Sequence, residues 1–265
     1  MAKRSEPPPG KKIRILCFGD SLTAGYSCLG AAHHPYREKL VQMVEMAFPE
    51  CEVESVVDGV SGDLVGRRGG FLGRMERRFT KADEADGELG TGYDWTIVLG
   101  GTNDLGWGTE PEILFDSLAK IYDIPLAHGS KVLALTIPEA GVKGPARERV
   151  DAKRNKVNDL IKGYKRDNFH VFDLHAAIPY YAMSEEDRRK FWDDHVHFTP
   201  AGYDLIGTKV GMALVSLLVK DKLKGETPAK RRRNFRDDDA MFEEEGGDPN
   251  SLDQGYIVVR RKDLE

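Results

Sequence analysis

The sequence predicts an α/β fold in which a parallel sheet carries helices on both faces. Short apolar runs rich in Val, Ile and Leu recur along the chain, as expected for strands that are buried on both faces. Segments with helical periodicity lie between these runs, and this strand-helix alternation is typical of a parallel sheet. The expected strands are Ile13–Phe18, Val53–Val57, Trp95–Leu99, Lys131–Ile137 and Val171–Leu174.

Two helical segments are marked by apolar residues that return to one face. Between the first two strands, Leu40, Val44 and Phe48 recur every fourth residue. The last helix has a start signal, with Thr199 as the expected N-cap and Pro200 at the first helical position. Its apolar face comprises Ile206, Val210, Ala213, Leu214, Leu217 and Leu218.

Composition indicates one core and gives no sign of export. The chain has 265 residues, of which 40% are hydrophobic, enough for one sizeable domain. Its net charge of −5 does not favour nucleic acid or an anionic membrane as a partner. We recognise no signal peptide in the sequence. Its apolar runs are all shorter than the roughly 20 residues that a membrane span needs. The odd set Cys17, Cys28 and Cys51 fits reduced thiols, so we expect a cytoplasmic protein.

The two ends of the chain differ from its middle. Residues 1–10 and 221–265 combine low hydrophobicity with blocks of like charge, and both are predicted to be disordered tails around a domain of residues 11–220. The basic run Lys230–Arg233 is a candidate nuclear localisation signal or an ordinary charged tail. Lys81–Gly92 is expected to be a flexible surface insertion.

Polar residues follow the expected strands, at the positions where ligands bind in open α/β sheets. Ser21 follows the first strand, Gly62 the second and Asn103 the third, while Asp194 and His197 lie beyond the fifth. If the sheet is parallel, these residues meet at one edge. Together they supply what acyl transfer requires: a nucleophile, a base with an orienting acid, and donors for an oxyanion.

The spacing within the last of these segments suggests the individual roles. A carboxylate at Asp194 can reach Nδ1–H of His197, three residues on, so that Nε2 can take a proton from Ser21. Each residue also has an ordinary interpretation, as a loop carboxylate, a histidine near a helix start or a turn serine.

A metal site is the competing interpretation of the same segment. His195 and His197, with Asp193 or Asp194, have ligand chemistry. Such a site needs a further ligand, and the pair at 33 and 34 is the only other close pair of histidines. We therefore favour the triad and expect no metal and no organic cofactor.

Four segments, in order, resemble the signature blocks of the GDSL, or SGNH, hydrolase family. The resemblance covers residues 13 to about 219, and the four blocks together are far more specific than any one alone. The segments are Gly19-Asp20-Ser21-Leu22, Ser61-Gly62-Asp63, Gly100-Gly101-Thr102-Asn103-Asp104 and Asp194-His195-Val196-His197. Intracellular fungal members are similar also at His34-Pro35-Tyr36 and Trp192-Asp193-Asp194.

The resemblance implies a three-layer α/β/α, flavodoxin-like fold with a five-stranded parallel sheet. It implies that Ser21 is the nucleophile, His197 the base and Asp194 its orienting acid. It further implies an oxyanion hole made by the N–H groups of Ser21 and Gly62 with the Asn103 amide. The residue types agree, because glycine lets a backbone approach a ligand and asparagine donates without adding charge.

Other residues near the same edge have weaker assignments. Trp107 is expected to line the substrate pocket or to cover the domain edge. His195 stands where the family often has a small residue, so it is expected to contact substrate or to crowd the site. Glu139 has no expected partner and is assigned to loop structure. The arginines at 67, 68, 74, 77 and 78 either meet an acidic substrate or form a solvated helix face.

The sequence thus predicts a serine hydrolase that cleaves carboxylic esters, with short, soluble acyl esters as its small-molecule substrates. Acyl transfer to an alcohol and thioester cleavage would use the same groups. A non-catalytic binding module with a partner-recruiting tail is the alternative from another class, although a binder has no use for the complete set. Nucleic-acid binding has only one short basic run in its favour. The oligomeric state is left open.

Overall fold

The main sheet of this protein has five parallel strands in a computed structural model that describes residues 11–67, 69–80, 92–226, 241–243 and 258–260. Its order is β4-β1-β5-β6-β7, so the first strand of this sheet lies between its second and its third along the chain. This is the order of flavodoxin-like sheets. The strands are β1 (Lys11–Gly19), β4 (Cys51–Gly59), β5 (Trp95–Leu99), β6 (Lys131–Leu135) and β7 (Phe169–Phe172).

Helices connect successive strands, and further short elements lie in the loops. The longer helices are α2 (Arg37–Ala47), α3 (Phe71–Thr80), α5 (Pro111–Ala127), α6 (Pro145–Gly163) and α9 (Pro200–Glu226). The short ones are α1 (Ser21–Ala24), η1 (Cys28–Gly30), α4 (Thr102–Gly106), α7 (Leu174–Ala177) and α8 (Glu185–Phe191). A small antiparallel pair is formed by β2 (Tyr26–Ser27) and β3 (Ala32–His33).

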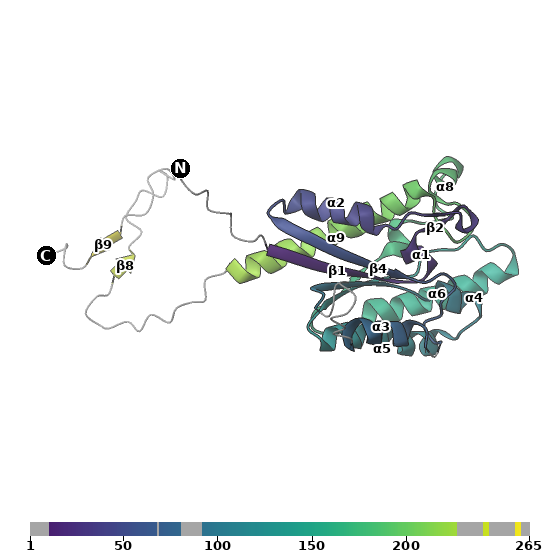
Figure 1. Cartoon of the computed structure of the whole chain (residues 1–265), viewed down its shortest axis with the longest axis horizontal. Helices are drawn as coiled ribbons and strands as arrows, with labels where there is room; N and C mark the ends of the chain where they lie inside the picture. The colour runs from purple at the N-terminus through teal and green to yellow at the C-terminus, as the bar shows by residue number, and fades with distance from the viewer. Residues whose placement is uncertain (1–10, 68, 81–91, 227–240, 244–257, 261–265) are drawn as a thin grey trace, which may run out of the picture. The chain divides into compact units, whose positions relative to one another are not determined.

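Alternate residues of each strand enter two cores on opposite faces of the sheet. In β1, Ile15 and Cys17 pack with α2 and α9, whereas Leu16 and Phe18 pack with α3, α5 and α6. Figure 1 shows these two sets of helices on either side of the sheet. Because both faces are covered, the strands read as continuous apolar runs. The predicted three-layer α/β/α fold is confirmed.

Several of the expected strand bounds differ from those of the structure by one or two residues, and the physical reason is visible at β6 and β7. The strand expected at Lys131–Ile137 ends at Leu135, because the amide side chain of Asn158 pairs with both backbone groups of Ile137, at 2.8 and 3.0 Å. The last strand is shifted toward the N-terminus. Asp173 ends it by accepting the N–H of Ala176 at 3.2 Å, which starts α7.

The start of α9 is as the sequence indicates. Thr199 Oγ1 accepts the N–H of Gly202 at 3.1 Å, which is an N-cap hydrogen bond, and Pro200 is the first helical residue. Within the described ranges one helix, Pro200–Asp221, has the length and apolar composition of a membrane span. Its residues Tyr203, Ile206 and Val210 are buried in the core, and core helices of soluble proteins commonly have this composition.

The chain divides into two units, residues 1–220 and 221–265. In the second unit the described strands β8 (Met241–Glu243) and β9 (Val258–Arg260) pair antiparallel. The helix α9 continues to Glu226, beyond the expected end of the domain at residue 220. Three predicted segments lie largely or wholly outside the described residues. They are residues 1–10, residues 81–91 of the predicted insertion, and most of the predicted C-terminal tail, including Lys230–Arg233.

Candidate active site

Ser21 lies at the carboxyl edge of the sheet because the chain turns sharply after β1. The side chain of Asp20 accepts the N–H of Leu22 at 2.9 Å and thereby caps the single turn α1. That turn ends at Gly25, whose φ of +77° is in the left-handed region that glycine favours. Ser21 is the first residue of α1 and is 5% exposed.

The structure brings Ser21, His197 and Asp194 together across 176 residues of sequence. Ser21 Oγ is 3.0 Å from Nε2 of His197, and Nδ1 of His197 is 2.8 Å from Oδ2 of Asp194. The other carboxylate oxygen, Oδ1, accepts the backbone N–H groups of Val196 and His197, each at 2.6 Å. Serine, imidazole and carboxylate therefore form one hydrogen-bonded chain.

The environment of Asp194 keeps its carboxyl group ionised. Burial raises the pKa of Asp194, but the hydrogen bonds from the backbone and side chain of His197 and from the N–H of Val196 outweigh burial, so the pKa is below its ordinary value. A carboxylate facing Nδ1 favours the tautomer with the proton on that nitrogen, which leaves Nε2 as an acceptor. The ring of Tyr26 packs on the imidazole, with centroids 4.5 Å apart.

Gly62 and Asn103 lie after the two strands that flank β1. Gly62 follows β4, in a turn closed by the N–H of Asp63 donating to Val60 O at 3.2 Å, and its φ is +74°. No atom lies within 4 Å of where its Cβ would be, so the turn faces open space. After β5, Asn103 Nδ2 donates to Asp63 O at 3.0 Å. An amide nitrogen has two N–H donors, so one remains for another acceptor.

This edge is the topological switch point of the sheet. From β1 the chain crosses to β4 on one side, and it later returns to β5 on the other. In open α/β sheets ligands bind outside the carboxyl ends of the strands at such a point. Residues 17–205 match the family of GDSL-like lipases and acylhydrolases, a span that includes every residue of this site.

This chain belongs to the GDSL-like lipase/acylhydrolase family. Like other members, it is a carboxylic ester hydrolase.

Solved structures agree with the fold of the family. The aryl esterase of M. smegmatis is 19% identical, with a TM-score of 0.55 over 78% of this chain and 99% of its own. A lipolytic G-D-S-L protein from Veillonella parvula is 22% identical, with a TM-score of 0.53 over 79% and 99%. The acetylxylan esterase Axe2 from Geobacillus stearothermophilus is 18% identical, with a TM-score of 0.54 over 78% and 95%. The comparison with curated proteins found no match.

His195 and Trp107 each lie close in sequence to a residue of the site of this GDSL-like hydrolase. His195 is exposed, and Nδ1 of its ring lies 3.0 Å from the hydroxyl of Tyr180. The backbone carbonyl of His195 accepts the N–H of Gly141 at 2.6 Å. Trp107 directly follows α4, the helix that carries Asn103, and is 83% exposed. Substrate contact by either residue stays a prediction.

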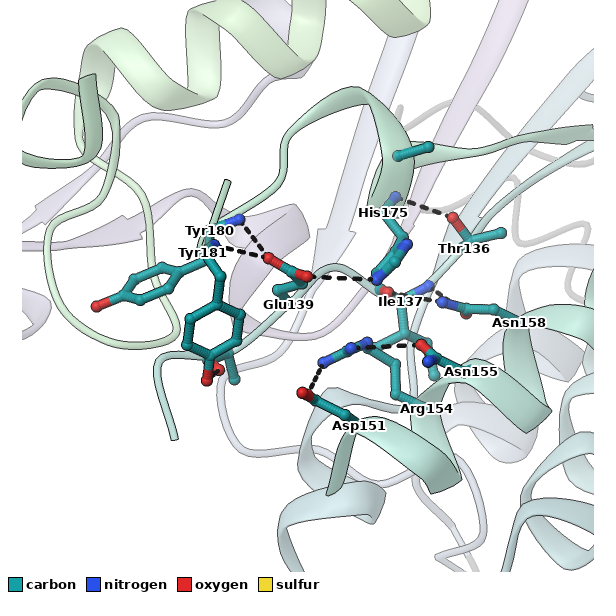
Figure 2. A network of polar contacts seen from close by, with 12 residues as sticks. Thr136, Ile137, Glu139, Asp151, Arg154, Asn155, Asn158, His175, Tyr180 and Tyr181 are labelled. Atoms are coloured by element: carbon teal, nitrogen blue, oxygen red, sulfur yellow. Dashed lines mark hydrogen bonds and ion pairs between the residues drawn. The ribbon is translucent and has the colours of Figure 1, made fainter. Parts of the chain in front are cut away.

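Glu139 has partners that the sequence did not predict. Its Oε2 accepts the N–H groups of Tyr180 and Tyr181 at 2.6 and 2.9 Å, and its Oε1 lies 3.7 Å from His175 Nε2. Figure 2 shows this carboxylate between the two tyrosine amides and His175. It ties the loop after β6 to the segment whose Tyr180 holds His195. In the sequence, only the position of Glu139 at the carboxyl edge of the sheet indicated that it could have a role beyond loop structure.

Arg74 was also misjudged from sequence, because it does not lie on a solvated helix face. Its side chain is buried and forms ion pairs with Asp58 and Asp63. The signal was its spacing, since Phe71 and Met75 share the buried face of α3 and Arg74 lies between them in the same stripe. Arg67 and Arg77 are exposed, and Arg68 lies outside the described residues.

No group of three or more His, Cys, Asp or Glu side chains suited to a metal ion occurs in the part of the chain that the structure describes. Of the histidines considered as additional ligands, His34 is paired through Nε2 with Asp204 Oδ1 at 2.9 Å. His197 is engaged on both ring nitrogens by Ser21 and Asp194.

Proposed function

We propose that this chain hydrolyses short-chain carboxylic esters through an acyl-enzyme on Ser21. His197 is the general base and Asp194 its orienting acid. The observation that carries the proposal is the continuous hydrogen-bonded chain from Ser21 Oγ to His197 Nε2 at 3.0 Å and from His197 Nδ1 to Asp194 at 2.8 Å. A serine activated by a base, which is in turn oriented by an acid, is the signature of nucleophilic catalysis.

The reaction follows from these positions. His197 Nε2 takes the proton of Ser21 as Oγ bonds to the acyl carbon, and the carbonyl oxygen becomes an oxyanion. As the C–O bond to the alcohol breaks, the alcohol leaves with the proton from His197. A water molecule then loses a proton to His197 and attacks the acyl carbon. The bond between Ser21 Oγ and the acyl carbon then breaks, the acid is released, and His197 returns the proton to Oγ.

The oxyanion is proposed to bind three N–H donors. The N–H of Ser21 begins α1, where the first N–H groups of a helix have no intrahelical acceptor. The N–H of Gly62 lies in the turn whose glycine faces open space, and the Asn103 amide has one N–H beyond the one donated to Asp63. Donors fixed before the reaction stabilise developing charge without reorganisation.

The proposed substrates are small esters with short acyl groups. Support comes from the neighbours, since one is described as an aryl esterase and another as an acetylxylan esterase. Trp107 and His195 are proposed to contact the acyl or alcohol part. We further propose that the enzyme is cytoplasmic and similar to intracellular fungal members, on the basis of His34-Pro35-Tyr36 and Trp192-Asp193-Asp194. It is proposed to have no nucleic-acid partner. It would enter the nucleus only if Lys230–Arg233 acts as a localisation signal.

Labelling with a fluorophosphonate probe, followed by peptide mapping, tests the assignment of Ser21. We expect a single adduct on Ser21 that disappears in His197→Ala. Ser21→Ala should fold normally and lose most of its turnover of p-nitrophenyl esters. Ser130→Ala is a matched control, because Ser130 is equally buried but bonds Thr96 at 2.9 Å, at the start of β6. Normal turnover by folded Ser21→Ala would contradict the proposal.

A series of p-nitrophenyl esters of increasing acyl length tests the substrate class, with the highest kcat/KM expected for acetyl or butyryl. Product analysis with an added alcohol separates hydrolysis from acyl transfer. We expect free acid as the main product, whereas a predominant new ester would identify an acyltransferase.

A further inference from the structure

Arg74 reaches backbone and side-chain acceptors from three segments beneath the catalytic edge. Its Nη2 donates to Gly19 O at 2.7 Å, and its Nε donates to Asp63 Oδ2 at 2.9 Å. Its Nη1 donates to the carbonyl of Asp58 at 3.0 Å and also to the Asp58 carboxylate. One guanidinium from α3 therefore joins the ends of β1 and β4 to the turn that contains Gly62.

Two of these acceptors, Gly19 and Asp63, lie close in sequence to a proposed oxyanion donor. Gly19 is two residues before Ser21, and Asp63 directly follows Gly62. The carbonyl of Asp63 accepts one N–H of Asn103 at 3.0 Å, so the position of Asp63 also decides where the Asn103 amide points. A shift of the guanidinium would consequently be transmitted to all three donors.

The guanidinium itself is rigidly held. Its carbon Cζ lies 4.5 Å from the centre of the Phe18 ring and 5.0 Å from that of Phe71. The Arg74 side chain is only 9% exposed. The carboxylates of Asp58 and Asp63 balance the positive charges of Arg74 and of Arg78, whose Nε donates to Asp58 Oδ2 at 2.7 Å. Arginine satisfies several acceptors at fixed angles in a way that lysine, a single ammonium, does not.

We propose that Arg74 is a positioning residue that fixes the three donors of the oxyanion hole. The inference rests on the proposed function of Ser21, Gly62 and Asn103. The Arg74 side chain touches no reacting atom but would align the oxyanion donors. This alignment matters because N–H donors stabilise the transition state only when they are fixed in place beforehand.

A double-mutant cycle on kcat tests this role. Arg74→Lys keeps the positive charge but cannot bridge the three segments. It is measured in the wild-type background and in the Asn103→Ala background, with p-nitrophenyl acetate as substrate. The matched control is Arg154→Lys, because Arg154 is also buried and ion-paired, to Asp151 at 2.7 Å, but lies in the separate network of Figure 2. Melting curves establish that each variant is folded.

We expect Arg74→Lys to lower kcat roughly 10- to 100-fold with KM within about twofold, since the lost interaction belongs to the transition state. In the Asn103→Ala background its effect should be at least threefold smaller, because the donor that it orients is already gone. Arg154→Lys should leave kcat nearly unchanged. A loss below about threefold, or a loss that persists in full in the Asn103→Ala background, would overturn the inference.

Asp63→Asn provides the test if Arg74→Lys does not fold. It removes one of the two carboxylates that Arg74 contacts but retains the backbone carbonyl that Asn103 uses, and the same reduced effect is expected in the Asn103→Ala background. Failure of the two proposals can be distinguished. Normal turnover by Asn103→Ala alone contradicts the proposed oxyanion hole, whereas slow turnover by Asn103→Ala with fully additive second substitutions contradicts only the role of Arg74.

Discussion

The carboxylate of Asp194 holds His197 through both of its oxygen atoms. Oδ2 lies 2.8 Å from Nδ1 of the imidazole, while Oδ1 accepts the backbone N–H of the same residue at 2.6 Å. Ring and backbone are thus fixed by one side chain three residues earlier. This explains why the segment, although a loop, can present Nε2 to Ser21 at hydrogen-bond distance.

Asp194→Asn should lower kcat for p-nitrophenyl acetate by about 10⁴ while the protein remains folded. The amide can place an N–H against Nδ1, which favours the tautomer whose Nε2 carries the proton and cannot accept one from Ser21. Initial rates and a melting curve check this prediction. Asp193→Asn, at the exposed neighbouring position, is the control. Turnover by folded Asp194→Asn within tenfold of wild type would refute an orienting role.

Asn103→Ala should reduce kcat by about 10²–10³ if its free N–H binds the oxyanion. KM should change little, because the interaction strengthens only when charge develops on the carbonyl oxygen. Steady-state kinetics on acetyl esters measure both constants. Asn155→Ala serves as the control, since Asn155 is an exposed residue of α6 whose side chain contacts Arg154 at 3.3 Å. An unchanged kcat would exclude the donor role.

Asp20→Asn should remove a loss of stability that the wild type shows between acidic and mildly alkaline pH. Burial, helped by the nearby charge of Asp104 and opposed by the hydrogen bond from Leu22, raises the pKa of Asp20 from its ordinary 3.8 to about 7. The folded state thus holds the proton more tightly than the unfolded state. Its stabilisation is complete below about pH 4 and is lost as pH rises through 7.

The size of the effect follows from the two pKa values and is on the order of 3 kcal/mol between pH 5 and pH 8. Chemical denaturation of wild type and Asp20→Asn at pH 5 and pH 8 measures it. The variant should gain stability relative to wild type as pH increases. A difference in stability that is the same at both pH values would show that Asp20 does not titrate in this range.

Glu139→Ala should destabilise the protein by roughly 2–4 kcal/mol, because the N–H groups of Tyr180 and Tyr181 both lose their acceptor in a partly buried position. Urea denaturation gives the change in the free energy of unfolding. Glu110→Ala is the control, since Glu110 forms an exposed pair with Lys153 and should cost less than about 1 kcal/mol. Equal effects of the two substitutions would contradict the proposed anchoring by Glu139.

The candidate site was largely predictable because each member follows a strand of recognisable pattern. A parallel sheet brings strand ends to one edge, so Ser21, Gly62 and Asn103 were expected together before any distance was known. Glu139 and Arg74 were not understood in the same way. Their partners are backbone groups and side chains from other segments, and no spacing along the chain shows which of these lie within reach of a given charge.

The sequence by itself determined the α/β architecture, the strands within about two residues, the start of α9 at Thr199 and the residues that can carry ester hydrolysis. These features are local, since they depend on apolar periodicity, caps and turn glycines. Only the tertiary structure decided what depends on contacts between distant segments. Burial raises the pKa of Asp20, the turn after β4 places Asp63 against Asn103, and Arg74 packs on Phe18 and Phe71 beneath the proposed oxyanion donors.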